Sequence, residues 1–315
     1  MRDTRVALLA TLVAAGCWGL SGTAAQALFV RFGFPVLGLV SIRMLSAGAL
    51  LLLLLRPGSR PALTGSFLVL AVLGIGGSQI TYLEAIQYSN AVTATLLQFL
   101  FLPMVAAYEA GTGRIRWSPA WSATVGLAAV GTLLLVAGPS TTSFGIRVTP
   151  GGLLFGLLSA VAGAYYSLAG GPLAQRHGPW PVTAWGFLLG GAVTLPFGAA
   201  ALAQYRLPAG TGPIAEVSGL VGFVVVFGTL LGYGLYLYGL GHLPATEAGV
   251  AASVEPISAG VATYLFLGVT LTVAQYAGGA LILVAVALLG ARKARGGGPP
   301  APPEKVRPPP PKPLS

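Results

Sequence analysis

Charge is scarce in this chain of 315 residues, of which only 8% are charged and seven are acidic. A soluble domain carries roughly 25% charged residues, so the composition excludes an ordinary water-soluble fold. The single cysteine, Cys17, excludes an internal disulfide, and we expect it to be a small core residue. Because there are only two histidines and no phosphate-binding loop motif, we expect no metal site, no cofactor and no ATP hydrolysis.

Long apolar stretches take the place of the missing charge. Hydrophobic residues make up 55% of the chain, and the mean hydropathy is +0.82. About 20 apolar residues are enough for a helix to cross the hydrocarbon core of a bilayer. We therefore predict an all-α integral membrane protein with ten transmembrane helices. The predicted spans are 6–30, 35–55, 63–87, 91–110, 119–138, 151–173, 181–203, 217–240, 245–267 and 272–290.

The Lys and Arg residues of the loops predict how these spans are oriented. With the N-terminus in the cytoplasm, thirteen basic residues fall inside and only Arg31, Arg147 and Arg206 fall outside. Ten spans return the C-terminus to the cytoplasm, where the Pro-rich residues 291–315 predict a disordered tail. The basic residues form no single face, so the net charge of +10 does not indicate a nucleic-acid partner.

An internal repeat divides the chain into two halves. Residues 31–36 recur as 176–182, and residues 82–103 resemble 236–256. We predict one five-helix copy in residues 1–140 and a second in 150–290. Since five is odd, the second copy enters the membrane from the opposite side. Inverted repeats of this kind let a secondary transporter open a central site first to one side and then to the other.

Several short motifs carry a resemblance to a known family. They include Cys17-Trp18-Gly19-Leu20, the stretch 85–98, and Leu243-Pro244-Ala245 leading to Glu255-Pro256. In this order and spacing the chain resembles the drug/metabolite transporter superfamily, specifically its ten-helix exporters with two EamA-type repeats. The resemblance implies export of small metabolites, amino acids among them, across the inner membrane. The chain departs from the family in having Gly268-Val269 where the family usually has Gly-Glu, and one extra residue before Pro103.

Ionisable residues at membrane depth are costly unless they are paired or reach water. Arg43 and Glu255 fall deep within the second and ninth predicted spans. One interpretation is a fixed ion pair between Arg43 and a carboxylate, with Glu84 as another candidate partner. The alternative is that Arg43 attracts a substrate carboxylate while a glutamate carries a coupling proton. Glu109 and Glu247 fall at cytoplasmic helix ends, where we expect solvated roles.

A mostly apolar pocket with a few polar groups is the usual form of a small-molecule site. Tyr166 and Tyr233 belong to a wider set of aromatic residues expected near such a pocket. Proline inside a helix removes a backbone hydrogen bond, so Pro103 and Pro256 are either hinges or kinks that improve packing. The predicted substrate-binding residues are Trp18, Ser21, Arg43, Gln79, Tyr82, Gln98, Tyr165, Trp185, Tyr236 and Glu255.

Together these features predict a secondary transporter that exports small organic metabolites by alternating access. We expect a monomer surrounded by lipid, driven by the substrate gradient or by proton exchange, and no catalytic residues. Two other transport functions fit the same features, namely efflux of lipophilic cations and import of a similar solute. A non-transporting membrane protein, such as a lipid-modifying enzyme or an assembly factor, is the alternative from another class.

Overall fold

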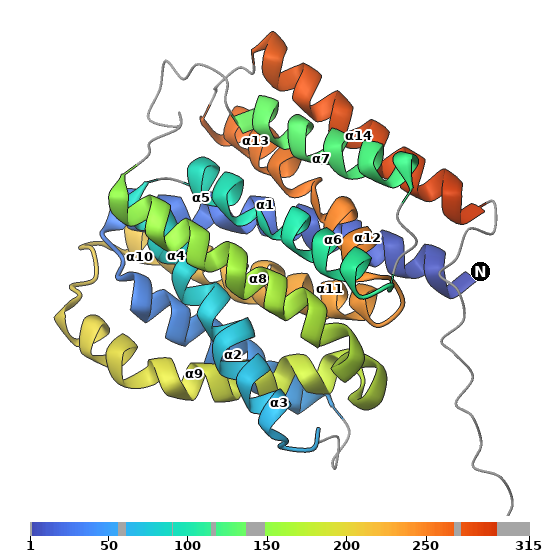
Figure 1. Cartoon of the computed structure of the whole chain (residues 1–315). Coiled ribbons are helices and arrows are strands. Elements are labelled where there is room, and N and C mark those ends of the chain that lie inside the picture. Colours follow the sequence, from blue (N-terminus) through green and yellow to red (C-terminus); the bar gives the residue numbers. More distant parts are fainter. Residues whose placement is uncertain are drawn as a thin grey trace, which may run out of the picture.

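A computed structural model describes residues 2–55, 61–89, 91–114, 118–136, 149–267 and 272–294 (Figure 1). These residues form helices joined by short turns, with no strand among them. The predicted all-α fold is therefore confirmed for the described part of the chain. The predicted tail from residue 295 onward lies outside the described residues, and the last helix continues to Ala294.

The first half of the chain begins with two long helices, α1 (Arg2–Phe32) and α2 (Val36–Leu54). The third predicted span is one continuous helix whose middle is π-helical. It consists of α3 (Gly65–Val69), η1 (Leu70–Gly76) and α4 (Gly77–Tyr88). The fourth predicted span is broken into α5 (Ala91–Gln98) and α6 (Phe101–Gly111), and α7 (Pro119–Val136) ends this half.

The second half repeats this order of elements. It begins with α8 (Pro150–His177) and α9 (Pro179–Gln204). A third helix follows with a π-helical middle, namely α10 (Thr211–Phe223), η2 (Val224–Leu231) and α11 (Gly232–Leu240). The next span is again broken, into α12 (Ala245–Ala252) and α13 (Glu255–Leu267), and α14 (Val273–Ala294) is the last helix.

Similar turns occur in the two stretches that resemble each other in sequence, residues 31–36 and 176–182. Gly33 follows α1 with a φ of 59°, and Gly178 follows α8 with a φ of 83°. Both values lie in the left-handed region that residues with a Cβ rarely adopt. Each glycine therefore ends one long helix and lets the chain turn directly into the next.

Among the described residues, six helices are long and apolar enough to cross a membrane by length and composition. They are Thr4–Phe32, Val36–Leu54, Gly65–Tyr88, Pro150–His177, Pro179–Gln204 and Thr211–Leu240. The fourth and ninth predicted spans are absent from this set because each is divided into two shorter helices. The membrane-spanning character of the chain is confirmed, whereas the count of ten spans stays a prediction.

Side-chain contacts join neighbouring elements at the two ends of the bundle. At one end of the bundle, Arg31 at the end of α1 forms an ion pair with Glu216 of α10. At the other end, Gln175 of α8 donates a hydrogen bond to the carbonyl oxygen of Gly241, 3.1 Å away. This arrangement is the one expected if successive spans cross the bundle in alternating directions.

Helices from the two halves pack against each other throughout the bundle. In Figure 1, α7 and α14 lie side by side at one edge, and α2 packs against α9 near the opposite edge. Small residues permit the close approach, since a Cβ on Gly131 of α7 would lie 2.8 Å from the carbonyl oxygen of Gly278. Membrane helices associate through such packing because lipid supplies no hydrophobic drive between them.

Candidate central cavity

A cavity lies between the two halves, lined by side chains from both of them. The cavity volume is about 50 Å³, which is room for roughly three to five water molecules. Seven of the ten predicted site residues line it. They are Trp18, Ser21, Arg43, Tyr82, Gln98, Tyr236 and Glu255. The structure therefore brings most of the predicted residues together, while their role in binding remains untested.

Arg43 enters the cavity wall from α2 and is only 4% exposed. Its Nε donates a hydrogen bond to Oγ1 of Thr229 at 2.8 Å, and its Nη2 donates to the carbonyl oxygen of Gly228 at 3.4 Å. Both acceptors belong to η2 and are neutral. Among the described residues no carboxylate forms an ion pair with Arg43, so the fixed ion pair considered from the sequence is not present in this conformation.

Glu255 is the first residue of α13 and is 5% exposed. Among the described residues, its carboxylate makes no hydrogen bond and no ion pair, although its backbone oxygen accepts from Ser258 Oγ at 2.8 Å. A buried charge without a partner is expensive in a membrane protein and marks a functional position. The cavity thus contains one basic and one acidic side chain, each without an oppositely charged partner in the described chain.

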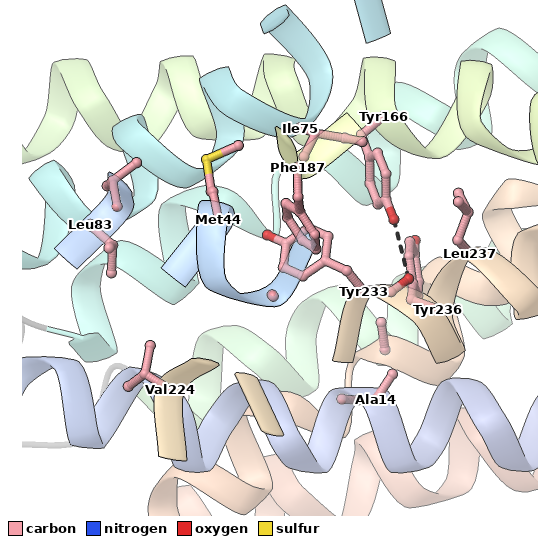
Figure 2. Close-up of a cluster of buried hydrophobic side chains, with 14 of the residues drawn as sticks. Ala14, Met44, Ile75, Leu83, Tyr166, Phe187, Val224, Tyr233, Tyr236 and Leu237 are labelled. Atoms are coloured by element: carbon pink, nitrogen blue, oxygen red, sulfur yellow. Dashed lines mark hydrogen bonds between the residues drawn. The ribbon is translucent and has the colours of Figure 1, made fainter. Parts of the chain in front are cut away.

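Aromatic rings form much of the remaining wall. The ring of Trp18 lies 4.9 Å from that of Tyr233 and 5.0 Å from that of Tyr236, measured between centroids. Figure 2 shows Tyr166, Tyr233 and Tyr236 gathered beside Phe187 in the core of the bundle. Edge-to-face and tilted contacts of this kind are favourable for aromatic pairs, and they hold the rings in fixed orientations.

Hydrogen bonds also fix the hydroxyl groups of these tyrosines. The Tyr82 hydroxyl lies 3.0 Å from Thr95 Oγ1, and the Tyr236 hydroxyl lies 3.0 Å from Ser167 Oγ. Tyr166 donates to the backbone oxygen of Tyr233 at 3.4 Å, as Figure 2 shows. The phenol groups are therefore oriented within the structure before any solute enters.

The two broken spans both face the cavity. Gln98 and Phe101 flank the break between α5 and α6, and Ala252 and Glu255 flank the break between α12 and α13. All four residues line the cavity wall. Non-helical backbone at membrane depth is tolerated where protein buries it or where it lines a polar cavity, and both conditions fit these breaks.

The two prolines lie just after these breaks. Pro103 is the third residue of α6, and Pro256 is the second residue of α13. The first turn of a helix leaves its backbone N–H groups without intrahelical partners, so a proline costs little there. Each proline therefore lies in the first turn of a new helix instead of kinking a continuous one, and the hinge role remains a prediction.

Three predicted residues lie outside the cavity wall. Gln79 is 1% exposed, and its amide nitrogen has no hydrogen-bond partner among the described residues. Tyr165 lies against Gly74 at the end of η1, where a Cβ on that glycine would be 3.3 Å from the ring. Trp185 is half-buried on α9. These positions neither establish nor contradict a role in another conformation.

Other cavity residues were not predicted from the sequence. Ser78, Phe99, Phe101 and Ser167 are examples, and all four line the cavity. Small hydroxyl residues and phenylalanines occur on every face of apolar helices, so their type carries no signal. Helical periodicity offers one clue, because Ser78 lies four residues before Tyr82 on the same helix and thus one turn away on the same face.

The solvated roles expected for Glu109 and Glu247 are wrong, because both side chains are only 4% exposed. Glu109 of α6 accepts hydrogen bonds from the backbone N–H groups of Ala245 and Thr246. These groups belong to the first turn of α12, which lacks intrahelical acceptors for them. Glu109 is therefore a helix cap supplied by a distant part of the chain.

The fold and the cavity define a class of protein, a multi-helix membrane protein with a small, polar-lined central chamber. Comparison with known proteins identifies that class as a transporter. The model of the EamA-like transporter family matches residues 5–137 and again 150–291. The chain belongs to this family, and the prediction of a multi-pass inner-membrane protein is confirmed.

Relatives in three organisms carry similar descriptions. The chain is 32% identical over 307 residues to the "Uncharacterized inner membrane transporter YicL" of Salmonella typhimurium, which covers 94% of this chain and 98% of that protein. It is 29% identical over 213 residues to an "Uncharacterized transporter" of Archaeoglobus fulgidus, covering 66% and 70%. The "Uncharacterized transporter YwfM" of Bacillus subtilis is 24% identical over 295 residues, covering 90% and 93%.

A solved structure has the same fold. It is described only as "Crystal structure of protein" and superposes with a TM-score of 0.73 over 93% of this chain and 99% of its own. The sequence identity is 19%, so the likeness shows the fold alone.

Proposed function

We propose that the protein is a secondary transporter that exports small organic metabolites carrying both charge signs, such as amino acids. The observation that carries this proposal is the pairing of Arg43 and Glu255 in one cavity without an ion pair between them. A zwitterionic solute brings a carboxylate for Arg43 and an ammonium group for Glu255. The cavity volume is about 50 Å³, which suits a solute of few heavy atoms.

The mechanism that we propose is alternating access between two inverted five-helix halves. The double match of the family model and the repeated order of elements support it. Both halves contribute to the cavity wall, so a change in their relative orientation would alter which face the cavity opens toward. Pro103 and Pro256 would act as hinges, because each lies in the first turn of a half-helix beside the cavity.

Within this mechanism the cavity residues have distinct roles. Arg43 binds the substrate carboxylate, and Glu255 binds its ammonium group or carries a coupling proton. Trp18, Tyr82 and Tyr236 form the apolar walls. Ser21 and Gln98 donate or accept hydrogen bonds. Gln79, Tyr165 and Trp185 would reach a substrate only in another conformation of the two halves.

A reconstituted-liposome assay tests the proposal directly. The full chain is inserted into vesicles and the flux of a panel of labelled amino acids and amines is measured. We expect at least one amino acid to cross faster than in empty vesicles, and Arg43→Gln and Glu255→Gln each to lower that flux. Flux equal to that of empty vesicles across the whole panel would contradict the proposal.

Efflux of lipophilic cations is a second candidate, favoured because the cavity holds both the carboxylate of Glu255, which has no ion-pair partner among the described residues, and the ring of Trp18. Glu255→Gln separates the two functions, because it should abolish cation efflux and only weaken export of a neutral zwitterion. Imposing the solute gradient in each direction distinguishes export from import. Flux that follows an imposed proton gradient identifies the proton as the coupling ion. We propose that the transporter works as a monomer.

A further inference from the structure

We infer that Thr229 is the positioning residue of an anion subsite in the central cavity, one that selects a solute with a carboxylate group. Thr229, on η2, holds one edge of the guanidinium of Arg43. The other edge of the guanidinium is left for the solute. The inference rests on the proposed function in one respect, since it takes the central cavity as the substrate site.

The hydrogen bonds of Thr229 define how it holds Arg43. Its hydroxyl donates to the backbone oxygen of Val224 at 2.8 Å, which commits the single hydroxyl proton. The remaining lone pairs of Oγ1 face Arg43 and accept its Nε–H at 2.8 Å. Because a guanidinium has only donors, Oγ1 accepts in this contact, while its own proton goes to Val224.

The π-helical geometry of η2 makes this arrangement possible. An α-helix pairs each carbonyl with the N–H four residues later, whereas a π-helical turn pairs it with the fifth. Oγ1 of Thr229 reaches the carbonyl of Val224, five residues earlier, and the carbonyl of Gly228 accepts Nη2 of Arg43. The carbonyl oxygens of Val224 and Gly228 thus each accept a bond from a side chain, which their two lone pairs allow.

Counting donors shows what Arg43 has left. A guanidinium carries five N–H groups, and the structure uses one on Nε and one on Nη2. Three remain, including both on Nη1. A carboxylate fits two parallel N–H groups of one guanidinium edge, and such charge-assisted pairs are roughly twice as strong as neutral hydrogen bonds. The neutral acceptors on η2 hold the arginine in place without neutralising it.

The same site is absent from the equivalent place in the first half. By the spacing that aligns Tyr82 with Tyr236, Thr229 corresponds to Ile75 of η1. By the spacing that aligns Val36 with Val182, Arg43 corresponds to Leu189 of α9. The equivalent contact joins η1 of the first half to α9 of the second half, where the apolar side chain of Ile75 lies against Gly186. The anion subsite is therefore a single site in an otherwise repeated architecture.

The charge in the cavity restricts the anion to one negative charge. Arg43 offers one positive charge, and Glu255 lies in the same small cavity. A dianion such as phosphate would leave an excess negative charge beside Glu255 in a medium of low dielectric constant. A monocarboxylate balances Arg43 and leaves Glu255 for a cationic group or a proton.

The test uses sodium acetate as the probe, because the carboxylate is the only polar group of acetate. The thermal unfolding of the purified full chain in detergent is followed while acetate replaces chloride at constant ionic strength. We expect acetate to stabilise the wild-type chain and Arg43→Gln to remove that stabilisation. Thr229→Val should weaken the apparent acetate affinity roughly tenfold, since a hydrogen bond to a charged group is worth about 1.5 kcal/mol or more.

Two further variants separate positioning from structure. Thr229→Ser keeps the hydroxyl and should bind acetate as the wild type does. Thr194→Val is a matched control, because Thr194 also accepts from an α2 side chain, Ser41, and donates to a backbone oxygen, that of Gly191. It should leave acetate binding unchanged. Thr229→Ala removes the hydroxyl with less bulk and replaces the valine variant if that variant unfolds.

The inference is overturned if acetate stabilises the wild type no more than chloride, or if Thr229→Val and Thr229→Ala bind acetate as tightly as the wild type. These outcomes are independent of flux. Acetate binding that depends on Thr229, in a protein that moves no amino acid, would support this inference and contradict the proposed function. Amino-acid flux without such acetate binding would contradict this inference and support the proposed function.

Discussion

The carboxylate of Glu109 accepts the backbone N–H of Ala245 at 2.9 Å, although the two residues are 136 positions apart. A second bond to the N–H of Thr246, at 2.8 Å, completes the cap. The contact joins the last turn of α6 to the first turn of α12, one helix from each half. A negative charge is also favoured at a helix N-terminus by the helix dipole.

Removing this cap should destabilise the protein. We expect Glu109→Ala to lower the free energy of unfolding by about 1–3 kcal/mol, because it leaves buried N–H groups without acceptors. Glu109→Gln should cost less, since the amide oxygen can still accept one bond. Thermal unfolding in detergent measures both. Glu216→Gln is the control, because the exposed Arg31–Glu216 pair contributes little; an equally stable Glu109→Ala variant would contradict the prediction.

Glycine at position 19 should be essential for the packing of α1 against the broken ninth span. A Cβ there would collide with the backbone oxygen of Glu255 and the side chain of Ser258. Because backbone cannot move aside cheaply, we expect Gly19→Ala to reduce both folded yield and transport. Gly16→Ala is a control on the same helix, with nothing within 4 Å of its Cβ. Equal yields of the two variants would count against this packing.

Gln98 and Gln79 should respond differently to substitution. Gln98 is half-buried and lines the cavity, so Gln98→Ala should weaken substrate affinity in the liposome assay while folded protein is retained. Gln79 is buried outside the cavity wall, and its amide nitrogen has no partner among the described residues, so Gln79→Met should lower transport less than Gln98→Ala does and leave stability equal or higher. The opposite pattern, with Gln79→Met losing affinity, would place Gln79 in the substrate path.

Replacing the prolines should affect the rate of transport and not the affinity. Pro103→Ala and Pro256→Ala restore a backbone N–H in the first turns of α6 and α13. The two half-helices can then join more easily, which would stiffen the breaks beside the cavity. We expect a lower maximal rate with unchanged half-saturation, measured by flux in liposomes. Pro150→Ala, at the start of a long unbroken helix, should change neither.

Much of the helical layout could be predicted from hydropathy alone. The second predicted span, 35–55, matches Val36–Leu54, and the seventh, 181–203, lies within Pro179–Gln204. The first helix is longer than predicted, Arg2–Phe32 against 6–30, because polar residues can continue a helix beyond the hydrocarbon region. Hydropathy records the length of the apolar stretch and not the ends of the hydrogen-bonded helix.

The π-helical segments and the choice between neighbouring residues could not be predicted. An apolar helix in lipid has no polar face, so its sequence does not reveal which side of it meets a cavity. Tyr165 and Tyr166 illustrate this limit, because adjacent residues point about 100° apart. Only Tyr166 lines the cavity. The glycine-rich stretch Gly74-Ile75-Gly76-Gly77 coincides with the end of η1 and the start of α4.

The two π-helical segments also determine how the sequences of relatives can be compared with this one. Each segment accommodates more residues per hydrogen-bonded turn than a regular helix does. Deleting one residue from η1 or η2 would let an ordinary turn close with one residue fewer, so the later side chains of that span would keep nearly the same direction. Tyr82 and Tyr236, both of which lie beyond these segments and face the cavity, would therefore still face it. A relative with a one-residue gap here would present a similar chamber to its solute, whereas a one-residue gap in a regular helix would rotate the later side chains by about 100°.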